Sequence, residues 1–160
     1  MKVRKMNETD LNDIAKIEAI CFPSAEAASL HTLEKRYNKF PECFWVLEEH
    51  DTVIGFINGM CTNQKTIHDE MFEDADKHEE TGLYQSVFGI SVLPSYQKQG
   101  GGKLLMEMLI DCAKKQQRKG CILTCKEHLI GYYERFGYEL LGVSQSVHGG
   151  AKWYDMILLF

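Results

Sequence analysis

The 160-residue chain lacks the features that mark several special classes of protein. No apolar run approaches the ~18 residues of a membrane span, and Met1–Lys5 carries no apolar stretch typical of a signal peptide. Lys/Arg-rich runs are absent and the formal net charge is −5, which argues against a general nucleic-acid binder. Repeats and low-complexity segments are missing too. We therefore expect a cytoplasmic protein without membrane or nucleic-acid partners, folded as one domain over residues 1–160.

The six cysteines lack the regular spacing of a disulfide framework, which favours reduced thiols. Cys121, Cys125 and His128 have the residue types of zinc ligands. The two cysteines, however, face the same side of one expected strand, and a fourth ligand is not evident. We expect no metal site.

The most informative stretch, residues 87–105, predicts a strand, a glycine turn and the start of a helix. β-branched and aromatic residues favour the strand, and Pro94 ends it. Gly100, Gly101 and Gly102 allow the backbone to bend and to approach a ligand closely. A helix that starts there presents unpaired N–H groups and the positive end of its dipole, so we expect a phosphate or pyrophosphate site. The expected apolar face of this helix is Leu104, Leu105, Met108, Leu109 and Cys112.

Two nucleotide-binding motifs do not fit this turn. Leu105 stands where a dinucleotide fingerprint needs its third glycine. Leu104 follows Lys103 where a P-loop needs a hydroxyl for magnesium. The remaining pattern is Gln97-x-x-Gly100-x-Gly102, with a plain strand–turn–helix connection as the alternative.

Apolar spacing and chain breakers predict an alternation of strands and helices. The segment 62–82 is polar and acidic, and forms either a solvated loop or a lid over an acceptor site. Gly89, inside a strand, suits a bulge that splays neighbouring strands apart. The order predicts an α/β fold: a mixed, mostly antiparallel sheet in one layer, splayed at a central bulge and flanked by about four helices. Strands are expected at 2–5, 44–48, 53–60, 85–93, 121–125, 138–143 and 153–160, and helices at 10–21, 29–40, 103–118 (ended by Gly120) and 128–136, with a short helix at 67–72.

A second motif, Tyr133-x-x-Phe136-Gly137-Tyr138, follows about thirty residues after the glycine turn. In this order and spacing, the two motifs closely resemble the GNAT N-acetyltransferase family, and the element order extends the likeness over the whole chain. Within the family, the chain looks most like the arylalkylamine (serotonin-type) branch. The local features shared with that branch are Cys21-Phe22-Pro23, the loop 66–73 and Cys125-Lys126-Glu127.

The resemblance implies a role for each part of these motifs, with acetyl-CoA as the donor. A backbone N–H near Gly89 would face the thioester carbonyl, a kind of interaction worth ~2.7–4 kcal/mol. Tyr133 would protonate the departing thiolate, although its ring could instead only pack against the sheet. The strand residues that would pair with the pantetheine arm are Ile90, Ser91 and Val92, and the pyrophosphate would be held by Gln97, Lys98, Gln99, Gly100, Gly101, Gly102 and Lys103.

The chain departs from the serotonin-type pattern at the general base. Ser86 and Phe88 stand where those enzymes carry two relay histidines. Deprotonating an amine of pKa ~10 at neutral pH costs about 4 kcal/mol, so some group must accept the proton. Water reached through Ser86 is one candidate and Glu26 is another, although Glu26 could equally bind the ammonium or only begin a helix. His148 could approach the site, or be a surface histidine in a glycine-rich turn.

We therefore expect acetyl transfer from acetyl-CoA to a primary amine by direct attack in a ternary complex. A small arylalkylamine or polyamine-like acceptor is the first hypothesis. A protein N-terminal or lysine acetyltransferase is the second, and a non-catalytic acyl-CoA-binding sensor is the rival from another class. The sequence leaves the oligomeric state open, a homodimer included.

Overall fold

A computed structural model describes all 160 residues, and its nine strands form two sheets. Every strand pair is antiparallel except β5 with β7, which is parallel. The first sheet has the order β1 (Lys2–Lys5), β2 (Phe44–Glu49), β3 (Thr52–Asn58) and β6 (Gly89–Val92). The second has the order β4 (Cys61–Thr62), β5 (Tyr84–Val87), β7 (Gly120–Cys125), β9 (Tyr154–Leu159) and β8 (Glu139–Val143).

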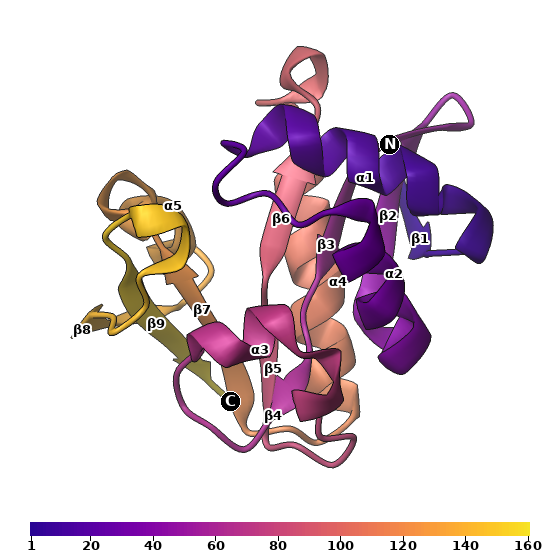
Figure 1. Ribbon diagram of the computed structural model, residues 1–160. Coiled ribbons are helices and arrows are strands. Elements are labelled where there is room, and N and C mark those ends of the chain that lie inside the picture. Colours follow the sequence, from indigo (N-terminus) through magenta and orange to yellow (C-terminus); the bar gives the residue numbers. More distant parts are fainter.

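Five α-helices flank the sheets, where about four were expected. They are α1 (Leu11–Cys21), α2 (Leu30–Lys39), α3 (Asp69–Glu73), α4 (Gly101–Lys115) and α5 (Ile130–Glu134). Figure 1 shows α1 and α2 on one face of the four-stranded sheet and α4 behind the opposite face. The side chain of Ser29 caps α2 by accepting the Thr32 N–H at 3.1 Å, at the start of the helix expected over 29–40.

Strand β2 shows how the first sheet is held between these helices. Phe44 and Val46 belong to the core beneath α1 and α2, whereas Trp45 and Leu47 belong to the core beneath α4. Successive side chains of a strand point to opposite faces, so β2 is buried on both. An apolar run without polar alternation is the sequence signature of such a strand.

The two sheets separate at Phe88, which lies between the last residue of β5 and the first residue of β6. The Phe88 N–H still donates to Asn58 O at 2.7 Å, so the branch point stays attached to β3. Beyond it, β6 continues with the first sheet while β5 pairs with β7, and β6 and β7 diverge (Figure 1). The predicted mixed, splayed sheet is confirmed, and at Phe88 the strands separate so far that hydrogen bonding divides it into two sheets.

The end of α4 differs from the prediction. The helix stops at Lys115, and Gln117 takes the left-handed conformation (φ 61°) that turns the chain. Gly120 is the first residue of β7 rather than a helix cap. A Cβ on Gly120 would lie 2.2 Å from Leu158 O, so the glycine serves close strand pairing with β9.

Some expected apolar faces are also shifted. Leu105 and Leu109 of α4 are buried as expected, but Leu104 and Met108 are 41% and 38% exposed. Ile20, an apolar residue near the end of α1, is 60% exposed. In α4 the buried stripe instead takes in Met106, Ile110 and Ala113, because the helix packs against both sheets.

All six cysteines are free, and Cys121 and Cys125 lie in the core beneath α4. The Sγ atoms of Cys43 and Cys61 approach to 3.9 Å. No cluster of three or more His, Cys, Asp or Glu side chains is arranged to hold a metal ion. None of the helices combines the length and the apolar character that crossing a membrane requires.

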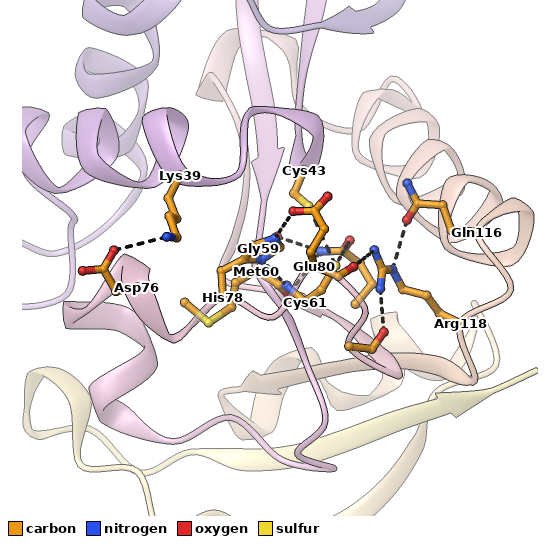
Figure 2. A network of polar contacts seen from close by, with 12 residues as sticks. Lys39, Cys43, Gly59, Met60, Cys61, Asp76, His78, Glu80, Gln116 and Arg118 are labelled. Atoms are coloured by element: carbon orange, nitrogen blue, oxygen red, sulfur yellow. Dashed lines mark hydrogen bonds and ion pairs between the residues drawn. The ribbon is translucent and has the colours of Figure 1, made fainter.

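Polar contacts anchor the acidic segment 62–82 to the rest of the molecule (Figure 2). The Cys61 N–H donates to the imidazole Nδ1 of His78 at 3.0 Å, and the Glu79 N–H donates to Cys61 O at 2.9 Å. Arg118, which follows α4, donates to the carbonyl oxygens of Gly82 and Glu80. These contacts hold residues 78–82 of the segment in place, which favours the lid interpretation over a freely solvated loop.

We predict that Arg118→Ala will lower the free energy of unfolding by about 1–2 kcal/mol, because two charge-assisted hydrogen bonds are lost at a half-exposed site. Amide hydrogen exchange in residues 74–84 will accelerate more than elsewhere. Urea unfolding and exchange mass spectrometry measure the two effects. The exposed Arg135→Ala is the control, and equal behaviour of both variants would show that Arg118 does not anchor this segment.

Candidate active site

A cavity of about 410 Å³ lies between the diverging strands β6 and β7. The branch point contributes residues 87–90 to its lining, and β7 contributes residues 123–125. The other lining residues come from segments that are distant in sequence: Glu18 and Phe22; 26–29; Thr32 and Arg36; Phe72 and Glu73; Leu129 and Tyr133; His148 and Trp153. The fold therefore brings the acidic segment, the start of β6 and Tyr133 of the second motif to one place.

Strand β6 leaves one backbone edge unpaired beside this cavity, because β3 is its only neighbour. The Leu93 N–H donates to Ile54 O at 2.8 Å. Since amide directions alternate along an antiparallel pair, the N–H groups of Ile90 and Val92 face away from β3. They are donors that an extended ligand can use.

Gln97 stabilises the end of this edge. Its side-chain amide donates to Val92 O at 2.8 Å, and the Cys21 thiol donates to the same oxygen at 3.4 Å. The side chain of Gln97 therefore positions the strand. Ser91, buried within β6, has a hydroxyl without a hydrogen-bond partner.

The glycine turn forms as the sequence predicts. Lys98 and Gly100 take positive φ values of 63° and 89°, and α4 begins at Gly101. The Leu104 N–H donates to Gly100 O at 3.1 Å, which leaves the N–H groups of the preceding turn without helical partners. The exposed loop at 97–100 leads directly to these donors, so the arrangement fits an anion.

Tyr132, the residue directly before the second motif, lies next to the helix start, a contact that the sequence did not indicate. A Cβ on Gly102 would lie 2.8 Å from the Tyr132 hydroxyl oxygen, so only a glycine leaves this space free. The rings of Tyr132 and Tyr133 meet edge to face, with centroids 5.1 Å apart. Tyr132 thus contacts the helix start, and the neighbouring Tyr133 lines the cavity.

Tyr133 is 7% exposed and lines the cavity. Its ring also meets Tyr138 edge to face at 6.1 Å, which fixes its orientation. Burial raises the pKa of the Tyr133 phenol above its ordinary value, with smaller contributions from Tyr132 and Cys125. The phenol is therefore a neutral proton donor over the whole neutral pH range.

The three other residues named from the sequence have different surroundings. Ser86 is fully buried and donates to Met60 O at 2.7 Å, and it does not line the cavity. Glu26 lines the cavity and forms an ion pair with Lys126 at 2.9 Å. His148 is not a surface histidine: it lines the cavity, and its Nε2 lies 2.9 Å from Glu26 O.

Two buried charges in the cavity wall were not identified from the sequence. Glu18 and Arg36 are each 6% exposed. Glu18 Oε2 accepts the Ala28 N–H at 2.9 Å, and Arg36 donates to Phe72 O at 2.9 Å. Burial raises the pKa of Glu18, and burial lowers the pKa of Arg36 to about 10. The sequence position of Glu18 could have indicated its burial, because Glu18 lies four residues after Ile14 on the buried face of α1.

Contacts between separate segments join the lid to the β8–β9 connection beside the cavity. Ser146 and the Val147 N–H both donate to the Asp69 carboxylate of α3, the latter at 3.0 Å. The Trp153 indole donates to His148 O at 2.9 Å. The Phe72 ring stacks on His148 with centroids 4.9 Å apart. The lid and the β8–β9 connection therefore form one continuous wall.

Comparison with known proteins agrees with this geometry. The acetyltransferase (GNAT) domain family matches residues 41–140. No curated protein sequence matches the chain. Among solved structures, the GphF GNAT-like decarboxylase in complex with isobutyryl-CoA is similar, with 18% identity, 99% coverage of both chains and a TM-score of 0.83.

Two N-acetyltransferases have the same architecture. The ribosomal-protein-S18-alanine N-acetyltransferase from Escherichia coli has 20% identity, coverage of 99% of this chain and 92% of its own, and a TM-score of 0.73. Arabidopsis thaliana Naa50, in complex with the bisubstrate analogue CoA-Ac-MVNAL, has 18% identity, coverage of 99% and 98%, and a TM-score of 0.73. Because the family match spans more than half of the chain and includes β6, the glycine turn and Tyr133, this protein belongs to the GNAT acetyltransferase family.

Proposed function

We propose that residues 1–160 act as one catalytic domain that transfers an acetyl group from acetyl-CoA to the primary amine of a small molecule. The acceptor attacks directly while both substrates are bound. One observation carries this proposal: the open edge of β6, Tyr133 and an acceptor wall of carboxylates and aromatic rings all border a single cavity.

The donor side is supported by backbone groups. The free amides of β6 suit the extended pantetheine arm, and the N–H groups at the start of α4 suit the pyrophosphate. Similar structures hold isobutyryl-CoA or a CoA-containing bisubstrate analogue, which supports the same donor class here. The free cysteines support a reducing compartment such as the cytoplasm.

The acceptor side favours a small cationic molecule of the arylalkylamine or polyamine type. Carboxylates attract an ammonium group, and aromatic faces bind cations and flat rings. The wall that faces this side is made by Glu18, Glu26, Glu73, Phe22, Phe72, Phe88 and Trp153. A polypeptide acceptor would need a groove for the rest of its chain. Here the contacts of Asp69 with Ser146 and Val147 join two of the surrounding segments, which favours an enclosed acceptor.

The chemistry then follows from these positions. The amine nitrogen attacks the thioester carbon, and charge grows on the carbonyl oxygen near the N–H donors at the start of β6. The C–S bond breaks, and Tyr133 gives its proton to the thiolate. Burial raises the pKa of the phenol, but the same low-polarity surroundings also disfavour the thiolate, so the transfer between them stays feasible.

An acceptor panel tests the proposal through the rate of thiol release from acetyl-CoA. The panel contains phenethylamine, tryptamine, spermidine, a peptide with a free N-terminus and an N-blocked lysine peptide. We expect at least one small amine to accelerate release at least about tenfold over hydrolysis. Acceleration by peptides alone would replace the proposal with a protein acetyltransferase. Binding of acetyl-CoA without acceleration by any acceptor would identify a sensor.

We predict that Tyr133→Phe will lower kcat by about 10²-fold or more, because the thiolate loses its positioned proton donor. Steady-state kinetics with the best acceptor measure the effect. Tyr138→Phe is the matched control, because Tyr138 is a buried phenol that contacts the Met106 sulfur at 3.5 Å and does not line the cavity. A Tyr133→Phe enzyme within about threefold of wild type would refute the acid role.

We predict that Gly102→Val will weaken CoA binding at least about tenfold, because a side chain there occupies the space beside the first helical N–H groups and meets Tyr132. Isothermal titration calorimetry with CoA measures the affinity. Asp111→Val places the same residue on the exposed face of α4 and should leave affinity unchanged. Equal affinities of the two variants would contradict the phosphate-binding role of this turn.

A further inference from the structure

Glu18 places a buried carboxylate next to the point where the two sheets separate. It lies on α1 and lines the cavity that also contains Gly89, the first residue of β6. A Cβ on Gly89 would lie 3.8 Å from Glu18 Oε1. The proposed reaction places the thioester carbonyl at this end of β6, so an attacking nitrogen would come within reach of the same oxygen.

The two oxygens of Glu18 have different surroundings. Oε2 accepts the Ala28 N–H at 2.9 Å, which fixes the orientation of the carboxylate. Oε1 has no hydrogen-bond donor from the protein, and no Lys, Arg or His nitrogen lies within ion-pair distance of the carboxylate. One oxygen is thus held in place while the other remains available to a ligand in the cavity.

The charged and titratable groups around Glu18 come from three elements. Arg36 of α2 and His148 of the β8–β9 connection favour its negative charge, and Cys21 is its titratable neighbour on α1. Burial acts in the opposite direction and raises the pKa of Glu18. A carboxylate whose pKa is raised in this way accepts a proton more readily than an exposed one.

The other candidates for the base are occupied elsewhere. Ser86 of β5 is fully buried and donates to Met60 O. The Glu26 carboxylate is paired with Lys126 at 2.9 Å, and the Nε2 of His148 is engaged by Glu26 O. Glu18 is the buried carboxylate of this wall that has no cation within ion-pair distance.

We propose that Glu18 is the catalytic base, an inference that rests on the proposed amine acetyltransfer. Its Oε1 takes one proton from the acceptor's ammonium group, so an N–H bond breaks, an O–H bond forms and the nitrogen lone pair is freed. The nitrogen then forms the C–N bond, the C–S bond breaks and Tyr133 protonates the thiolate. The second nitrogen proton restores the Tyr133 phenol. Glu18 releases its proton to solvent, which accounts for the one proton that the overall reaction liberates.

Glu18→Gln tests this role with two acceptors of equal shape and different basicity. The amide oxygen of Gln can still accept the Ala28 N–H, so the fold is preserved. The acceptors are the best amine of the panel and its aminooxy analogue, which for phenethylamine is O-benzylhydroxylamine. The amine is an ammonium ion at neutral pH, whereas the aminooxy nitrogen is already neutral and needs no base before attack.

We predict that Glu18→Gln will lower kcat/KM for the amine by about 10²–10⁴-fold and for the aminooxy analogue by less than about threefold. With the amine, the rate of the variant will rise about tenfold per pH unit up to the amine's own pKa, because only the free base reacts. The wild-type rate will instead level off once Glu18 is deprotonated, at lower pH. Asp13→Asn removes an exposed carboxylate from the same helix and should change neither value.

The outcomes separate this inference from the proposed function. Equal losses with both acceptors, or an unchanged pH profile, would overturn the role of Glu18 while leaving acetyl transfer intact. A wild-type enzyme that acetylates no amine would overturn the function before any variant is made. If Glu18→Gln does not bind acetyl-CoA, Glu18→Asp is measured instead. A wild-type pH profile together with a loss of kcat/KM for the amine alone supports Glu18 as the base. An equal loss of kcat/KM for both acceptors overturns that role.

Discussion

The separation of the two sheets at Phe88 is the constraint on which the rest of the structure depends. Because β5 pairs in parallel with β7, the chain needs a long crossover between them, and α4 supplies it. Helix α4 follows β6 in the chain. Its start therefore lies near the edge of β6 that no other strand pairs with. One branch point thus produces the unpaired backbone edge, the exposed helix start and the cavity between β6 and β7.

The burial of charged and polar groups in the cavity wall lowers the stability of the fold, so core packing does not explain why these groups are there. Burying Glu18 and Arg36 without a direct ion pair removes two charges from water, and the Arg36 Nε and Asn58 Nδ2 atoms have no hydrogen-bond partners. Apolar residues of similar size at these positions would give a more stable fold than the buried charges do. Their presence beside the branch point is therefore better explained by the charge and the proton of a bound amine than by stability.

The sequence predicted those parts of the site that depend on short segments. The β-branched strand, the left-handed Gly100 and the helix start all follow from local preferences, and Tyr133 belongs to a compact motif. Contacts between distant segments could not be predicted from the sequence. Glu26 forms an ion pair with Lys126, which lies 100 residues away, and the hydroxyl of the buried Ser86 donates to Met60 O. Gly120 was misjudged because a glycine after a basic helical turn resembles a cap, whereas its role depends on Leu158 of β9. Glu18 had a local signal in its place on the buried face of α1, but a glutamate in a helix usually points to solvent.

The family likeness is informative about the donor and much less so about the acceptor, for a physical reason. The donor side is built from the amides of β6 and the helix start, and backbone groups keep their geometry wherever the fold is kept, even at 18–20% identity. The acceptor side is built from side chains on α1, α2, the lid and the β8–β9 connection, each of which can change without altering the fold. Proteins of this architecture can therefore share a donor and differ in acceptor. The acceptor of this protein must accordingly be inferred from its own side chains, which here are carboxylates and aromatic rings around one cavity.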